Sequence, residues 1–368
     1  MKFRFFTVSL FLWLVSFANL AFSTQYMVSV SGDDHAGGTQ KNPWKTVTRA
    51  VRTLQPGDTL IVTGGIYEDA FELKALTGEV NRHIVICAAP NRRVLLDILR
   101  SESGGIRLTG CAYVTIHGFE IVGARKSSGI TLQDCHHCII EGNVVQDCSS
   151  IGIQLISGSD NILRGNICFH NNSGIYVGSL STRNMIEANV CAYGNKTSEH
   201  ADGIGSSNCK GNTYRFNLLV GNNDDGLDMW TSTGSLIEYN LAALNGDQRD
   251  GDGNGFKLGG KWPDNNEWLG GGHTVRSNVS FDNMSTGFTN NGSKGNTYES
   301  NAAYRNRNTG SYSSVKHTDP ANAEPILAEI RKKYRQIFDS GLIRPRINPL
   351  PVEFDRVFQI STIDKIMH

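Results

Sequence analysis

The feature that most constrains the fold of this 368-residue chain is a repeat of roughly 23 residues in its middle part. One column of asparagines recurs at this period: Asn143, Asn166, Asn189, Asn217, Asn240, Asn278 and Asn301. A unit this short cannot bury its own apolar face, so the repeats are expected to stack into a solenoid. The period is too short for a propeller blade, and the leucine spacing of a leucine-rich repeat is missing.

A column of glycines follows the same period and indicates strands. Each glycine precedes a large apolar residue, and a polar residue comes next in most repeats. These pairs are Ile130-Thr131, Ile153-Gln154, Ile175-Tyr176, Ile204-Gly205, Leu227-Asp228, Phe256-Lys257 and Phe288-Thr289. Such alternation places one side chain in a core and the next in solvent. The sequence therefore predicts an all-β fold, a single-stranded right-handed parallel β-helix, with the asparagines forming a ladder inside it.

The segments on either side of the repeats are expected to cap the solenoid. Residues 44–54 carry apolar side chains at helical spacing before the turn Pro56-Gly57-Asp58, which predicts an N-terminal capping helix. Residues 323–338 also have a helical pattern, and we assign residues 311–368 to a C-terminal cap or extension of the same domain. Residues 24–310 then form the β-helix domain itself.

Residues 1–23 have the pattern of a secretory signal peptide. Lys2 and Arg4 precede an apolar run over residues 5–17, and Ala21-Phe22-Ser23 offers small residues for cleavage. An N-terminal membrane anchor is the weaker alternative, because a spanning helix needs roughly 20 apolar residues. We expect a secreted, extracellular or periplasmic monomer without membrane contact after cleavage. Its 35 basic and 35 acidic residues balance, which argues against a polybasic nucleic-acid binder.

Eight cysteines raise the question of disulfide bonds in an exported chain. Cys111 and Cys135 lie at equivalent positions of adjacent repeats, where their Cα atoms would be about 5 Å apart. This pair is the best candidate for a bridge. Cys168 and Cys191 fall in an inward column and are expected to be buried thiols.

Insertions interrupt the period at three nearby places, and the candidate chemistry lies around them. Asp202 and Asp225 both precede the column glycine, so their backbones should stack about 4.8 Å apart on consecutive coils. With Asp224 and Asp228 they form a patch of four outward carboxylates, which repel one another unless a cation lies between them. Ligation by oxygen alone at this charge favours Ca²⁺.

Two points qualify this assignment of a metal site. Strict alternation would place Asp225 and Asp228 on opposite faces, so we expect a corner of the coil near Gly226. The alternative is that the aspartates only form turns beside glycines, but this does not explain Asp228 in a strand column.

Lys257 occupies the strand position of Asp228 on the following coil. A bound Ca²⁺ would lower its pKa and make it a general base, whereas the carboxylates would raise its pKa. A single outward lysine is ordinarily a solvated charge. The neighbouring acidic patch favours the catalytic interpretation.

At these residues the sequence resembles the family 9 polysaccharide lyases, the β-helical pectate lyases. The matching motifs, in the family's order, are His200-Ala201-Asp202-Gly203, Asp224-Asp225-Gly226-Leu227-Asp228 and Asn254-Gly255-Phe256-Lys257-Leu258-Gly259-Gly260. The resemblance covers most of the chain between Pro56 and about Asn301. It implies that Asp202, Asp224, Asp225 and Asp228 bind one Ca²⁺ and that Lys257 abstracts a proton.

The resemblance also implies a reaction: β-elimination on polygalacturonate, an acidic polysaccharide. Ca²⁺ would bind the uronate carboxylate and acidify the proton at C5, Lys257 would remove that proton, and the glycosidic bond at C4 would break. No side chain stands out as the acid for the leaving oxygen. The alternatives are a lyase for another uronate polymer such as alginate or a glycosaminoglycan, a glycoside hydrolase with paired carboxylates, and a non-catalytic surface β-helix that binds carbohydrate.

Overall fold

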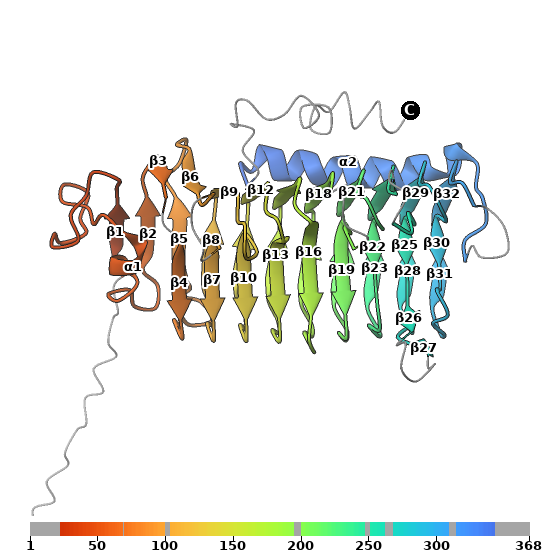
Figure 1. The fold of residues 1–368 in the computed structure, drawn as a ribbon, viewed down its shortest axis with the longest axis horizontal. Coiled ribbons are helices and arrows are strands. Elements are labelled where there is room, and N and C mark those ends of the chain that lie inside the picture. The colour runs from red at the N-terminus through yellow and green to blue at the C-terminus, as the bar shows by residue number, and fades with distance from the viewer. Residues whose placement is uncertain are drawn as a thin grey trace, which may run out of the picture.

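The computed structural model describes residues 23–68, 70–99, 104–194, 200–246, 251–261, 268–308 and 314–342. Three long parallel sheets run side by side, and successive strands of the chain pass from one sheet to the next (Figure 1). This arrangement confirms the predicted all-β parallel β-helix. The predicted signal peptide lies, except for Ser23, outside the described residues.

The three sheets are numbered here in the order in which a coil visits them. Sheet 1 contains β1 (Gln25–Val28), β2 (Thr59–Val62), β5 (Ile84–Ala88), β8 (Val114–His117), β11 (Ile139–Glu141), β14 (Ile162–Arg164), β17 (Met185–Glu187), β20 (Thr213–Arg215), β23 (Leu236–Glu238), β28 (Thr274–Arg276) and β31 (Thr297–Glu299). Sheet 2 contains β3 (Gly65–Tyr67), β6 (Val94–Asp97), β9 (Glu120–Val122), β12 (Val144–Gln146), β15 (Ile167–Phe169), β18 (Val190–Ala192), β21 (Leu218–Val220), β24 (Leu241–Ala243), β29 (Val279–Phe281) and β32 (Ala302–Tyr304).

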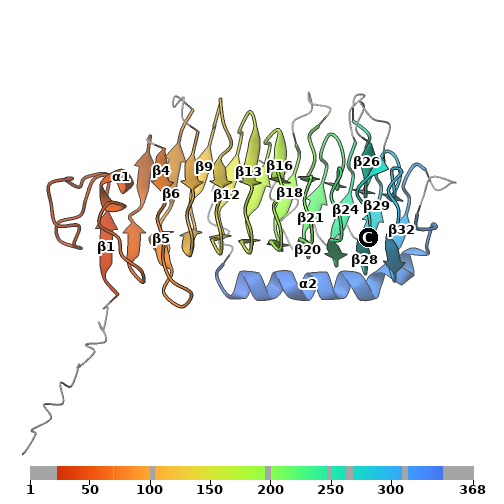
Figure 2. The same cartoon turned by 90° about the horizontal axis from the view of Figure 1, so that it is seen from below.

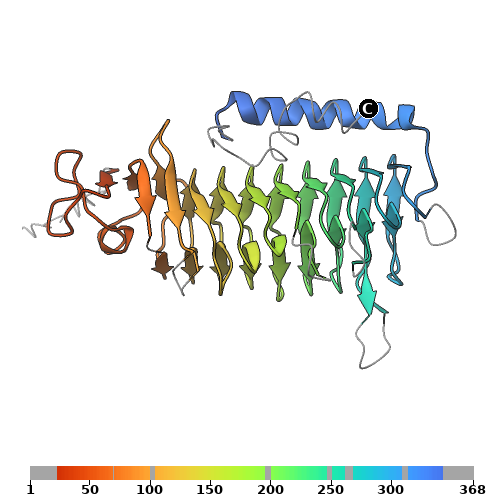
Figure 3. The same ribbon diagram turned by 45° about the horizontal axis from the view of Figure 1, so that its top comes forward.

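Sheet 3 carries the glycine column. It contains β4 (Phe71–Lys74), β7 (Ile106–Thr109), β10 (Ile130–Gln133), β13 (Ile151–Ile156), β16 (Ser173–Gly178), β19 (Ile204–Ser207), β22 (Leu227–Asp228), β25 (Phe256–Lys257) and β30 (Phe288–Thr289). A short antiparallel pair, β26 (Gly260–Lys261) and β27 (Trp268–Leu269), projects from the stack (Figure 3).

The register of sheet 3 confirms the alternation expected from the sequence. Ile204 pairs with Leu227 and Leu227 with Phe256, and all three side chains are buried in the core. Phe256 then stacks on Phe288 of the next coil, with ring centroids 4.6 Å apart. One inward position per coil therefore forms a continuous apolar column along the solenoid.

The asparagine ladder is present and satisfies buried backbone groups between coils. The backbone N–H and Nδ2 of Asn189, for example, both donate to Oδ1 of Asn217, at 3.0 and 3.1 Å. Two further ladders occupy other corners and were not predicted: Asn161, Asn184 and Asn212 form one, and Asn222, Asn245, Asn283 and Asn306 form the other. The asparagine side chains thus supply hydrogen-bond acceptors for amide groups at the turns that are buried away from water.

The two ends differ from the expected caps in detail. The N-terminal helix α1 (Val47–Ala50) is a single turn, capped by the Thr46 side chain, rather than a helix over residues 44–54. At the other end, the chain crosses the last coil, where the backbone N–H of Ser314 donates to Phe288 at 2.9 Å. It then enters η1 (Pro320–Ala323) and α2 (Glu324–Asp339).

The predicted C-terminal helix is confirmed, but it lies along the solenoid rather than over its end. Figures 1 and 2 show α2 running beside the coils, on sheet 2. Its Leu327 and Ile330 are buried in one cluster with Val190 and Leu218 of that sheet. The Tyr334 hydroxyl donates to the backbone oxygens of Asn189 and Phe216, at 3.0 and 2.8 Å. Within the described residues, no helix has the length and apolar character needed to cross a membrane.

The predicted disulfide bond between Cys111 and Cys135 is wrong, since all eight cysteines are free. Both thiols are buried and find backbone acceptors instead: Cys111 Sγ donates to Leu73 at 3.4 Å, and Cys135 Sγ to Gln133 at 3.3 Å. Cys168 and Cys191 are buried register partners, as expected for core thiols.

Candidate active site

The five residues predicted from the sequence meet on sheet 3. Asp228 in β22 is the register partner of Lys257 in β25. Asp202 and Asp225 stack on adjacent coils: the backbone N–H of Gly203 donates to the Asp225 backbone oxygen at 2.9 Å, and that of Asp225 to Asp202 Oδ1 at 3.2 Å. The glycine column therefore brings all of the candidate residues to three consecutive coils.

Asp225 and Asp228 point to the same side of the sheet. One carboxylate oxygen from each of Asp202, Asp225 and Asp228 lies within 4.8 Å of the others. Strand β22 begins only at Leu227, so the strict alternation of a strand does not apply between Asp225 and Asp228. The expected corner near Gly226 is confirmed.

The carboxylates are much less exposed than the predicted outward patch. Asp225 is fully buried, and Asp224 and Asp228 are 4% and 8% exposed. The chain just before β25 contacts them: the backbone N–H of Asp252 donates to Asp224 Oδ1 at 2.6 Å, and Asn254 donates its backbone N–H to Asp225 Oδ1 at 2.7 Å. This cover removes the water that would otherwise screen their charges.

Lys257 is held by three carboxylates. Its Nζ lies 3.2 Å from Asp225 Oδ2, 3.2 Å from Asp228 Oδ2 and 2.7 Å from Asp252 Oδ2. The ammonium also lies 5.6 Å from the centre of the Trp230 ring. Asp252 and Trp230 were not predicted, because neither stands in the repeated columns; the only signal for Asp252 is its place in an acidic insertion before Asn254.

Burial and crowding shift the pKa of Asp224, Asp228 and Lys257. Burial raises the pKa of Asp228 to about 8 against the opposing charge of Lys257. Burial, with the charge of Asp225, raises the pKa of Asp224 to about 7. For Lys257, burial favours a lower pKa, but the charges of Asp225 and Asp228 outweigh it and raise the pKa above its usual value. One ammonium thus compensates only part of the negative charge.

The residues fit a hard divalent cation. Asp228 Oδ1 is buried without a hydrogen-bond partner, and Asp225 Oδ2 accepts no hydrogen bond although it lies 3.2 Å from the Lys257 ammonium. A second group of oxygens, from Asp224, Asp225 and Asp252, lies within the same 4.8 Å limit. Several convergent carboxylates with free oxygens are the ligands that Ca²⁺ prefers.

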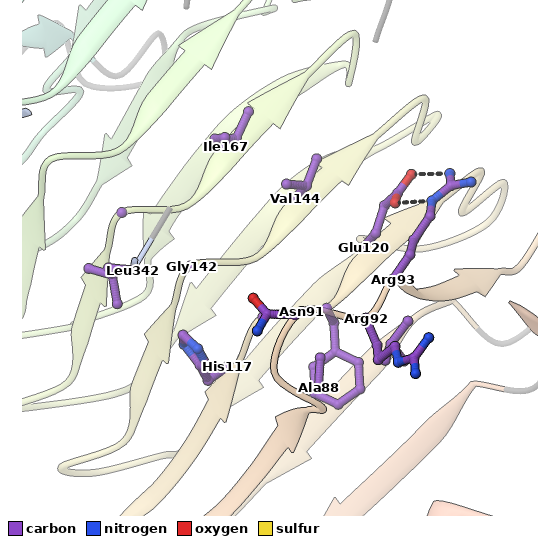
Figure 4. Close-up of a pocket in the computed structure, with 14 residues that line it drawn as sticks. Ala88, Asn91, Arg92, Arg93, His117, Glu120, Gly142, Val144, Ile167 and Leu342 are labelled. Atoms are coloured by element: carbon purple, nitrogen blue, oxygen red, sulfur yellow. Dashed lines mark hydrogen bonds and ion pairs between the residues drawn. The ribbon is translucent and has the colours of Figure 1, made fainter. Parts of the chain in front are cut away.

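A separate cavity lies at the corner between sheets 1 and 2 (Figure 4). Its wall includes Ala88, His117, Val144 and Leu342, and an ion pair between Arg93 and Glu120 with a 2.6 Å hydrogen bond. None of the clustered aspartates lines it, so this cavity is separate from the candidate site.

Comparisons with known proteins agree with this fold. A family model described as the Pel9A-like right-handed β-helix region matches residues 26–322. Pectate lyase PEL9 of Emericella nidulans is 25% identical over 309 residues, which cover 73% of this chain and 70% of that protein. Pectate lyase L of Dickeya chrysanthemi is 28% identical over 303 residues, covering 76% of this chain and 65% of that protein.

Among solved structures, pectate lyase Pel9A shares the fold with a TM-score of 0.57 and 22% identity, covering 82% of this chain and 74% of its own. A rhamnogalacturonan lyase gives a TM-score of 0.56 and 20% identity, covering 78% and 75%. The matched region thus covers about two thirds of the length of each of these two curated relatives.

Proposed function

This chain belongs to the Pel9A-like right-handed β-helix family, and from that premise we propose that it is a secreted, Ca²⁺-dependent lyase that cleaves polygalacturonate by β-elimination. Its curated relatives are pectate lyases. The observation that carries the proposal is the convergence of four aspartates and Lys257 on consecutive coils, with two carboxylate oxygens, Asp225 Oδ2 and Asp228 Oδ1, that accept no hydrogen bond.

In this proposal Asp202, Asp224, Asp225 and Asp228 hold the cation. Asn254 orients Asp225 by donating its backbone N–H and Nδ2 to Oδ1, at 2.7 and 2.9 Å, which directs Oδ2 into the cluster. When bound, Ca²⁺ would coordinate the uronate carboxylate and make the proton at C5 more acidic. The backbone N–H of Asp252 fixes Asp224 in the same way, at 2.6 Å.

Lys257 acts as the general base. Its neutral amine takes the proton from C5, the electron pair of that bond forms the C4–C5 double bond, and the C4–O bond of the glycosidic link breaks. We assign the proton for the leaving oxygen to water. The product chain therefore ends in an unsaturated uronate.

The contacts of Lys257 explain why its amine would depend on the cation site. Three carboxylates hold the ammonium and raise its pKa, whereas its burial lowers it. Once Asp225 and Asp228 have another cationic partner, the opposing charge on Lys257 is weaker and burial favours the neutral amine. The lysine is thus a base only in the loaded site.

An assay on polygalacturonate tests the proposal. We expect ultraviolet absorbance from the unsaturated product with Ca²⁺ and none after chelation. New reducing ends without absorbance would indicate hydrolysis and contradict the proposal. Elimination on alginate but not on polygalacturonate would support the reaction type and contradict the proposed substrate. Full activity in chelator would contradict the proposed requirement for Ca²⁺.

A further inference from the structure

An aromatic side chain stands in the same outward column as the catalytic candidates. Tyr176 in β16 is the register partner of Gly205 in β19, and Gly205 is the partner of Asp228 in β22. Tyr176, Gly205, Asp228 and Lys257 therefore follow one another on four consecutive coils. Along the solenoid, Tyr176 therefore lies before the carboxylates and Lys257 lies after Asp228.

The Tyr176 ring spreads over the surface of the sheet instead of standing away from it. A Cβ at Gly178, two residues further along the same strand, would overlap the ring, and one at Gly205 would lie 3.4 Å from it. The hydroxyl interacts with Ser207 on the neighbouring strand. Tyr176 is only partly buried, so part of the residue remains accessible to solvent.

The two glycines are explained by the ring and not by the backbone. Neither Gly178 nor Gly205 has a positive φ, so an ordinary residue could adopt either backbone conformation. The coil before Tyr176 has Ile156 at the position of Gly178. Glycine is therefore needed here because a side chain would displace the ring from the sheet.

Gly205 also keeps the space beside the carboxylates open. A Cβ on it would lie 3.2 Å from Asp202 Oδ2 as well as 3.4 Å from the Tyr176 ring. The space above Gly205 thus lies between the aromatic ring of Tyr176 and Asp202, which is a predicted cation ligand. A sugar ring presents an apolar face that suits such a surface, while its acidic group suits the cation site.

We propose, on the basis of the proposed function, that Tyr176 and Gly205 form a subsite for one pyranose ring of the polyuronate chain. The sugar stacks on Tyr176 above Gly205. It lies next to the uronate unit whose carboxylate would bind the cation held by the aspartates. Tyr176 is a substrate-binding residue in this assignment and takes no part in proton transfer.

The test measures binding of hexagalacturonate by calorimetry in the Lys257→Ala protein with saturating Ca²⁺, so that the ligand is not consumed. Adding Tyr176→Ala should weaken binding by roughly three- to tenfold. Tyr176→Phe should bind within about twofold of the parent, since the ring remains. Gly205→Val should weaken binding by filling the space. Tyr239→Ala, which removes a half-buried aromatic ring between sheets 1 and 2, is the matched control.

A kinetic measurement separates binding from a general structural effect. With Lys257 present, Tyr176→Ala should raise KM and leave kcat and Ca²⁺ affinity unchanged. If the wild-type protein is active and Tyr176→Ala binds the oligosaccharide with unchanged affinity, the subsite proposal is wrong, whereas the proposed function stands. A wild-type protein that neither binds nor cleaves the oligosaccharide would overturn the proposed function and the subsite with it.

Discussion

At the scale of single residues, the proposed function depends on the groups that surround Lys257. Its ammonium contacts Asp225 and Asp228, which are candidate metal ligands, and also Asp252, whose side chain is 61% exposed. The first two carboxylates would turn to the cation, but Asp252 lies at the edge of the cluster. Asp252 is therefore the residue best placed to adjust the basicity of Lys257 without abolishing activity.

Replacing Asp252 with Asn should move the rising limb of the pH–rate profile to lower pH. The Asp252 carboxylate stabilises the ammonium and so raises the pKa of Lys257. Its removal lowers that pKa, and the neutral amine is present at lower pH. Because Asp252 is exposed, we expect a shift of roughly half a unit.

The measurement is kcat/KM against pH at saturating Ca²⁺, with the exposed Asp134→Asn as a control that should shift nothing. If the rising limb of the pH–rate profile of Asp252→Asn stays in place or moves to higher pH, Asp252 does not raise the pKa of Lys257. Calcium affinity should be recorded as well, since Asp252 lies in a second carboxylate group with Asp224 and Asp225.

At the scale of strands and turns, the ladders hold the coils in register. Asn217 accepts from the backbone of Asn189 at 3.0 Å and donates to Ile186 and Asn240, each at 2.9 Å. Asn217→Ala leaves these buried groups unpaired, so it should lower the free energy of unfolding by roughly 2–4 kcal/mol. Urea denaturation checks this, with the exposed Asn42→Ala as a control of small effect. Equal midpoints would contradict a stabilising ladder.

His273 replaces asparagine in another ladder and should make stability sensitive to acid. Its Nδ1 accepts from the Ser235 backbone N–H at 3.2 Å, and burial lowers its pKa to about 4. The unfolded chain takes up a proton near pH 6.5 and the folded chain does not, so stability is lost as pH falls from 6.5 to 4. The expected loss is about 3 kcal/mol.

His273→Asn should remove this loss, because an amide oxygen accepts the same hydrogen bond at any pH in this range. Thermal unfolding between pH 7 and pH 4 compares it with the wild type and with the exposed His35→Asn. A variant as acid-sensitive as the wild type would contradict this role of His273.

The repeated columns explain which elements could be predicted from the sequence. Column glycines and asparagines fixed the period, and the period alone placed Asp228 beside Lys257. The ladder through Asn161 and Asn184 was missed, because its column also contains Ser235 and His273 and so lacks a uniform residue. The disulfide prediction failed although the Cys111 and Cys135 side chains interact, because matching positions on adjacent coils bring two thiols close without requiring them to form a bond.

At the scale of the whole molecule, the core and the candidate site are separate. The core lies between the three sheets and beneath α2, whereas the aspartates lie on the outer side of sheet 3. The position of α2 on sheet 2 could not be predicted, because its amphipathic pattern shows that it packs but not on which face. The carboxylate burial was missed for a similar reason, since it comes from an insertion outside the repeat.

Chelation should therefore abolish activity and leave the solenoid folded. The circular dichroism spectrum should stay that of a β protein in chelator, and the midpoint of thermal unfolding should fall only by a few degrees, as loss of a bound ligand requires. Loss of the folded spectrum at room temperature would show that the cation is structural.

The most direct test of the central claim compares wild type and Lys257→Ala on polygalacturonate at alkaline pH with saturating Ca²⁺. Lys257→Ala should lower kcat by roughly 10²- to 10⁴-fold, the usual effect of a lost general base. Calcium binding should not weaken, because the ammonium shares Asp225 and Asp228 with the cation. Lys257→Arg should fail too, since a guanidinium stays protonated. Absorbance from the unsaturated product should appear with the wild type and be nearly absent with both variants; substantial turnover by Lys257→Ala would show that Lys257 is not the base.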